Sequence, residues 1–176
     1  MDVLRMRSTV LFLSILAGCD VGSLQPGGGT GTDGGGGGGD GGGNVAACVN
    51  RGTPGAAYDH GGGVTHAGEN CMQAGCHGGG GGGSVFTAAG TVYKADLTTP
   101  NPGAVVRIRS GGNELTAVAD SAGNFRFAQT ITFPGETDVT ACPNQVPMVT
   151  PLGNGDGACS RAGCHVAGAQ GVIRFE

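Results

Sequence analysis

Glycine is unevenly distributed along this chain, and its distribution limits where a folded core can form. Of the 40 glycines, 27 lie between Gly22 and Gly83 and only 12 lie between Ser84 and Glu176. A glycine-rich stretch loses much backbone entropy on ordering and has few side chains to bury in return. We therefore expect one small folded domain in the second half, preceded by a disordered Gly-rich tether over 19–47 and an irregular Cys/His segment over 48–83.

Residues 1–18 have the features of a secretory signal. Arg5 and Arg7 give a positive start, residues 10–16 form a short apolar run, and small residues precede Cys19. The apolar run is too short to span a bilayer as a helix. The pattern resembles the bacterial lipoprotein signal, which implies that residues 1–18 are removed and that Cys19 carries the lipid. We therefore expect the lipid on Cys19 to hold the mature protein at a membrane, in the periplasm or at the outer membrane or cell surface.

Short runs in the second half have the composition of β-strands, over 84–93, 104–110, 114–119, 124–129 and 137–142. In the second run Val106 and Ile108 alternate with Arg107 and Arg109, which predicts one face toward a core and the other toward water. Turn-forming residues separate the runs, and no segment has a convincing helical period. We predict an all-β fold, with a small β-sandwich over 84–142 and, within 143–176, the second Cys/His motif and a C-terminal strand.

Several motifs in this region resemble one family of β-domains. They are Gly90-Thr91-Val92-Tyr93, Pro102-Gly103-Ala104-Val105-Val106-Arg107-Ile108 and Asp120-Ser121-Ala122-Gly123-Asn124-Phe125-Arg126-Phe127. Over about residues 84–141 the chain is similar to the carboxypeptidase-regulatory-like, transthyretin-like domain. The resemblance implies a Greek-key β-sandwich with a structural or presenting role and no catalysis of its own.

Two functional classes are not expected from the sequence. The formal net charge is -4, and the chain has no Trp, 2 Tyr and 6 Phe, so it has neither a basic stripe nor an aromatic platform for nucleic acid. It shows no Ser-His-Asp order and no paired-carboxylate setting, and the glycine run over 78–83 lacks the lysine of a phosphate-binding loop. We expect a protein that is not an enzyme and does not bind nucleic acid.

Two matching cysteine motifs carry the chemistry of this chain. Residues 71–77 and 159–165 each place four residues between two cysteines, Ala-Gly before the second cysteine, and a histidine directly after it. This plan resembles the c-type haem site, in which two thiols reach the vinyl groups of one porphyrin edge and the adjacent imidazole binds iron. The usual site has two residues between its cysteines, and some multihaem c-type cytochromes have the longer spacing. We expect Gly75 and Gly163 to take a positive φ that folds the extra length back.

The resemblance implies two covalently bound haem c groups, each with one iron. The cofactor-binding thiols are then Cys71, Cys76, Cys159 and Cys164, and the proximal iron ligands are His77 and His165. His60 and His66 are the remaining histidines and would complete two bis-histidine irons, with Met148 as a competing ligand for the second iron.

The order of motif, β-domain and motif over about residues 69–173 also resembles a group of secreted bacterial cytochrome-like proteins. This second resemblance implies that the two motifs lie near each other at one end of the sandwich. We hypothesise a membrane-anchored c-type dihaem electron-transfer lipoprotein, whose redox partner protein the sequence does not identify.

Other interpretations of the cysteines stay open at this point. Beyond Cys19 the chain has six cysteines, which allow fifteen disulfide pairings in an oxidising compartment. If haem takes the four motif cysteines, Cys48 and Cys142 remain as one bridge between the N-terminal segment and the end of the last strand. Zinc held by two cysteines and a histidine, and a redox-active dithiol, are further alternatives. The alternative function is a non-redox, disulfide-stapled surface lipoprotein whose β-sandwich is a structural or binding module.

Overall fold

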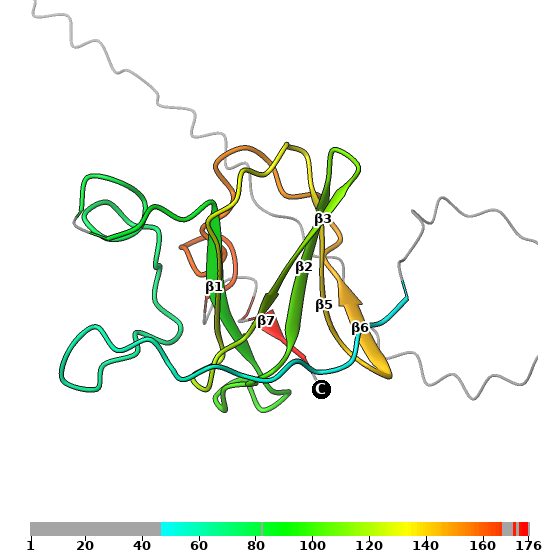
Figure 1. The fold of residues 1–176 in the computed structure, drawn as a ribbon, viewed down its shortest axis with the longest axis horizontal. Helices are drawn as coiled ribbons and strands as arrows, with labels where there is room; N and C mark the ends of the chain where they lie inside the picture. The colour runs from blue at the N-terminus through cyan, green and yellow to red at the C-terminus, as the bar shows by residue number, and fades with distance from the viewer. Residues whose placement is uncertain (1–46, 82, 167–170, 172, 176) are drawn as a thin grey trace, which may run out of the picture.

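The computed structural model of the protein describes residues 47–81, 83–166, 171 and 173–175. The predicted signal peptide over 1–18, the lipidation site Cys19 and the predicted tether up to residue 46 lie outside the described residues and stay predictions. The described part contains no helix, and so none that could cross a membrane. Its strands form two sheets (Figure 1), which confirms the predicted all-β fold.

The strands are β1 (Ala88–Tyr93), β2 (Val105–Ser110), β3 (Asn113–Val118), β4 (Asn124–Phe127), β5 (Glu136–Ala141), β6 (Asn144–Pro147) and β7 (Ile173–Arg174). One sheet has the order β4-β1-β7 and the other the order β3-β2-β5-β6. Strand β7 is parallel to β1, and the other pairs are antiparallel. The chain changes sheet between β1 and β2, between β3 and β4, between β4 and β5, and between β6 and β7. These crossings build a sandwich from the short hairpins.

Apolar side chains from both sheets fill the space between them. On the first sheet Val92 and Phe127 are almost fully buried, and on the second sheet Val106, Ile108 and Val139 join the same core. Full burial of a side chain of this size stabilises a fold by about 1.5–3 kcal/mol. The core lies entirely in the second half of the chain, where the low glycine content predicts it.

Arg107 departs from the predicted alternation. Its side chain was expected on the face of β2 that contacts water, but only 2% of it is exposed. The Arg107 Nε atom lies 2.8 Å from Asp138 Oδ1 on the neighbouring strand β5, and its Nη1 donates to the carbonyl oxygen of Ala47 at 2.9 Å. The N-terminal segment covers this face of the sheet, and the ion pair supplies the partner that a buried guanidinium needs. The expectation of a fully solvated face is therefore wrong at this position.

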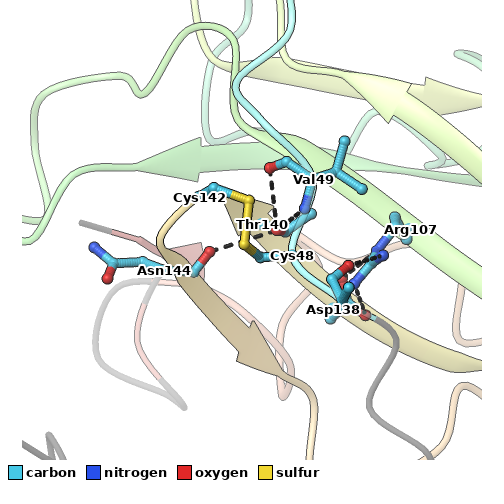
Figure 2. The surroundings of a disulfide bond; sticks show 8 residues. Cys48, Val49, Arg107, Asp138, Thr140, Cys142 and Asn144 are labelled. Atoms are coloured by element: carbon cyan, nitrogen blue, oxygen red, sulfur yellow. Dashed lines mark hydrogen bonds and ion pairs between the residues drawn. A yellow bond between two sulfur atoms is a disulfide. The ribbon is translucent and has the colours of Figure 1, made fainter. Parts of the chain in front are cut away.

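A disulfide fixes the covering segment to the sheet (Figure 2). Cys48 is joined to Cys142, which follows β5 directly, with the two Cα atoms 5.3 Å apart. Beside the bridge the amide of Val49 donates to Thr140 Oγ1 at 2.9 Å, and the amide of Cys142 donates to the carbonyl oxygen of Val49 at 2.9 Å. A bridge between the N-terminal segment and the end of a strand is expected if the motif cysteines serve another purpose. The Cys48–Cys142 disulfide is this bridge.

The largest differences from the predicted strands are the start of β1 and the presence of β6. Strand β1 begins at residue 88 and not at 84, because residues 84–87 bend toward the first cysteine motif before joining the sheet. Strand β6 was not predicted, because its four residues contain a single β-branched side chain, Val146, and prolines lie at 143 and 147. It pairs with β5 at the sheet edge, where a proline is tolerated.

Candidate functional site

Polar contacts hold the part of the Cys/His segment around Thr65 and Gly68 beside the strands β1 and β4. The amide of Gly68 donates to Thr91 Oγ1 at 2.8 Å, and that hydroxyl donates to Asn124 Oδ1 at 2.6 Å. The Nδ2 atom of Asn124 donates to the carbonyl oxygen of Thr65 at 3.0 Å. The segment has too few large apolar residues to build a core of its own. Its position is therefore set by the surface of the sheet.

The two C-x4-C-H motifs fold into the same loop. In each motif the histidine amide donates to the carbonyl oxygen of the first cysteine, at 3.0 Å for His77 and 2.9 Å for His165. Gly75 and Gly163 both have a φ of 86°. A Cβ atom at either glycine would meet nothing within 4 Å, so the backbone conformation and not the available space favours glycine. The predicted positive φ at these two positions is confirmed.

The likeness of the two loops extends to their sulfur atoms. The amide of the second cysteine donates to the carbonyl oxygen three residues earlier, at 3.1 Å in both loops. The side chain of that same earlier residue contacts the second thiol: Gln73 Nε2 lies 3.6 Å from Cys76 Sγ, and Arg161 Nε lies 3.4 Å from Cys164 Sγ. One backbone plan therefore presents both cysteine pairs, although the two sequences share only their cysteines, histidine and Ala-Gly pair.

A pocket of about 430 Å³ lies beside the first motif. Its lining includes Cys71, Cys76 and His77 of the motif together with the two upstream histidines, His60 and His66. The volume falls in the range of about 300–1,000 Å³ that is typical of small-molecule sites. The structure thus brings the first motif and both upstream histidines to the wall of one cavity, whereas two bis-histidine irons would need one upstream histidine at each motif.

The imidazole of His77 is held in one orientation. Its Nδ1 atom lies 2.7 Å from the carbonyl oxygen of Ser84, and its ring stacks on Phe86 with the centroids 4.0 Å apart and the planes 12° apart. Because a carbonyl only accepts, this contact places the ring proton on Nδ1 and leaves Nε2 as the lone-pair donor. Metal-binding histidines usually have such a second contact. The Nε2 atom of His77 points toward Nε2 of His60, 3.5 Å away.

His66 lies next to His60 and is held by an acidic neighbour. The His66 Nδ1 atom is 2.9 Å from Glu69 Oε2, and its ring meets the ring of His60 edge to face at a centroid distance of 4.8 Å. His66 has a φ of 51°, an uncommon conformation for a residue other than glycine. Both upstream histidines therefore gather at the first motif, so three of the four histidines of the chain surround one cavity.

The second motif packs against the sandwich. The amide of Cys159 donates to the carbonyl oxygen of Ala89 on β1 at 3.0 Å, and its side chain contacts the core. Burial raises the pKa of the Cys159 thiol to about 12, with a smaller contribution from the nearby Cys164. Partial burial also lowers the pKa of His165. The thiols of the second loop therefore face protein, whereas those of the first loop face a cavity.

The two loops meet at the strand β1. Ala89 lines the pocket of the first motif and also forms an isolated parallel bridge with Ala158, the residue before Cys159. The charge of Cys71 adds slightly to the raised pKa of Cys159, as expected for two neighbouring thiols. Both motifs therefore lie beside the strand β1, next to Ala89.

The four motif cysteines are not joined in disulfides, whereas Cys48 and Cys142 are. The structure therefore differs from an arrangement in which each motif closes on itself as cystine.

Within the described residues no group of three or more His, Cys, Asp or Glu side chains could hold a metal ion. An iron in porphyrin takes four nitrogen ligands from the macrocycle and needs only axial ligands from the chain. Met148 packs against the core, in agreement with an ordinary structural role.

Phe86, Tyr58 and Arg126 are among the pocket residues that were not identified as site residues from the sequence. Phe86 positions His77, and the guanidinium carbon of Arg126 lies 3.5 Å from the ring centroid of Tyr58 at the pocket wall. The alternation in β4 predicts an outward side chain at position 126, but no sequence signal places the segment with Tyr58 over it.

Comparison of the chain with protein-family models, curated proteins and solved structures found no match. The sequence resemblances to lipoproteins, carboxypeptidase-regulatory-like domains and haem motifs stay predictions.

Proposed function

We propose that this protein is a lipid-anchored c-type haem protein that carries electrons. The orientation of His77 is the observation that supports this proposal most directly. Its Nδ1 atom is engaged by a backbone carbonyl, and its Nε2 atom faces a second imidazole inside a pocket that two thiols line. A covalently held haem would supply one-electron redox chemistry at this site. No substrate-converting group is needed, so the proposed role is a carrier and not an enzyme.

Four residues would hold the cofactor at the first motif. Cys71 and Cys76 would form the thioether bonds, and His77 and His60 would be the iron ligands. The Nε2 atoms of these two histidines lie 3.5 Å apart at the pocket wall. Bis-histidine ligation predicts a lower potential than His/Met ligation.

The proposal extends to the second motif because the two loops share one backbone. Cys159, Cys164 and His165 would hold a second haem. The Cys159 side chain packs against the core and Cys164 is buried, so both thiols would have to leave these contacts to do so. A lipid on Cys19 would keep the protein at a membrane, where a redox partner protein reaches the exposed loops. Asymmetry between the loops leads us to expect that the first motif is loaded before the second.

The experiment is to produce the full chain in a bacterium with c-type haem attachment machinery and to measure the mass of the denatured protein. Two covalent haems are expected on the wild type, and one each on the variants Cys71→Ala/Cys76→Ala and Cys159→Ala/Cys164→Ala. The two variants are matched controls for each other. A colourless protein with cystine in both motifs would contradict the proposal and support the disulfide-stapled surface lipoprotein.

The axial ligands are separated by single substitutions. His77→Ala and His60→Ala are expected to convert the first haem from a six-coordinate to a five-coordinate spectrum while the second haem is unchanged. His66→Ala is the control, because its Nδ1 atom is engaged by Glu69 and the histidine whose Nε2 atom lies 3.5 Å from Nε2 of His77 is His60. A six-coordinate spectrum in His60→Ala that is lost in His66→Ala would reverse this assignment.

A further inference from the structure

The wall of the pocket carries a cation that the proposed iron ligation does not use. Arg126 is on β4 with its side chain exposed, and its guanidinium carbon lies 3.5 Å from the ring centroid of Tyr58 and 5.4 Å from that of Phe86. It is the one Lys or Arg in the pocket lining. No ion pair involving Arg126 is found within the part of the chain that the structure describes.

The carboxylates of the same wall already have partners. Glu69 Oε2 is bound to His66 Nδ1 at 2.9 Å. Asp59 Oδ1 accepts hydrogen bonds from the amides of Gly61 and Gly63, at 2.7 and 3.0 Å. The charge of Arg126 is therefore available to a ligand that enters the pocket.

Stacking on Tyr58 sets the orientation of the guanidinium group. The donors of a guanidinium lie in its plane, so a group that covers an aromatic face keeps its edge N–H groups open to a partner. A carboxylate is the partner whose two oxygen atoms match such an edge, through two parallel charge-assisted hydrogen bonds. The stacking also lowers the entropy that the side chain would lose on binding.

The apolar residues of the pocket indicate what kind of molecule would carry the carboxylate. Phe86 and Phe125 are aromatic residues of the lining, and Ala89 is a small apolar one. We infer that Arg126 is the carboxylate anchor of this pocket, and that the pocket selects a flat apolar molecule with a carboxylate at its edge. The inference rests on the proposed function and deepens it, because a porphyrin with propionate arms belongs to this ligand class.

The test compares two probes on the full chain produced in a host without haem attachment machinery. The probes are an iron porphyrin with two propionate arms and its dimethyl ester, both in the same detergent and both titrated by the shift of the Soret band. Arg126→Met is expected to weaken binding of the diacid by about three- to tenfold, which is the range for an exposed to partly desolvated ion pair. Binding of the diester is expected to stay within twofold of the wild type.

Two controls keep the result interpretable. Arg174→Met removes an exposed arginine from β7 outside the pocket and should change neither affinity. Arg126→Lys keeps the charge without the planar fork and should recover part of the diacid affinity even if Arg126→Met folds poorly. Equal losses for diacid and diester, no loss for either, or failure of the wild type to bind the diacid would each overturn the inference. Covalent haem on Cys71 and Cys76 is read separately by mass, so failure of the proposed function is distinguishable from failure of the anchor.

Discussion

Removal of the Cys48–Cys142 bridge tests how far the N-terminal segment depends on its covalent link to the sandwich. The two cysteines are 94 residues apart, so the bridge closes a loop that contains the first motif and strands β1 to β5. Constraining a loop of about 100 residues lowers the entropy of the unfolded chain by an amount worth about 4.7 kcal/mol. Native contacts beside the bridge, such as the pairing of Val49 with Thr140, do not need the sulfur bond. We therefore expect Cys48→Ala/Cys142→Ala to lose about 4 kcal/mol of unfolding free energy.

Urea unfolding followed by circular dichroism measures this loss, since the chain has no Trp to report by fluorescence. With an m-value of about 2 kcal/mol/M, a loss of about 4 kcal/mol lowers the midpoint by about 2 M. Wild-type protein with the bridge reduced is the matched control and should unfold at the same midpoint as the double variant. A midpoint within about 0.3 M of the oxidised wild type would refute the reasoning, because it would mean that the unfolded chain gains no freedom from the missing bridge.

The remaining predictions concern the buried ion pair, the motif loop and one exposed turn. Asp138→Asn removes the buried carboxylate that lies 2.8 Å from Arg107 Nε and leaves the more distant Glu114 at 3.9 Å, so it should cost about 3–5 kcal/mol in urea unfolding. Gly75→Ala forces alanine into a left-handed conformation and should cost about 1–2 kcal/mol, whereas Gly55→Ala, equally open but without a positive φ, should cost none. The pKa of Asp96 is lowered to about 2, chiefly by the hydroxyl and amide of Thr99, so NMR titration of Thr99→Ala should show a higher value. Because the folded pKa is the lower one, the contribution of Asp96 to stability is present above the unfolded pKa and is lost as the pH falls toward 2.

The sequence predicts the sandwich well because its strands are local features. The alternation of Val106 and Ile108 and the glycine-containing turns both act over a few residues, and the structure contains all five of the predicted strands. The buried position of Arg107 was missed because it depends on a segment about 60 residues earlier that a disulfide brings across the sheet. A periodic pattern predicts which side chains share a face, but it does not show what covers that face.

The same distinction applies to the candidate site. The repeated motif predicts the loop itself, including the positive φ of Gly75, because the hydrogen bonds that close the loop lie within its seven residues. The clustering of His60 and His66 at one motif was not predictable, because it depends on hydrogen bonds from their segment to Thr91 and Asn124 on the sheet. In a glycine-rich segment, the number of residues between two histidines does not predict whether they lie close together, since such a segment has no preferred path.

The position of His77 explains why a segment without a core can still carry a precise site. The backbone amide of Phe86 donates to the carbonyl oxygen of His77 at 2.9 Å, the carbonyl of Ser84 orients the imidazole, and the amide of Thr87 donates to Phe127 of β4 at 2.7 Å. The imidazole is therefore fixed by the residues that lead into β1 and not by the glycine-rich loop around it. Function on an irregular segment needs this kind of support from a rigid element. Because the second loop is fixed to the same strand through Ala89, one strand sets the positions of both motifs.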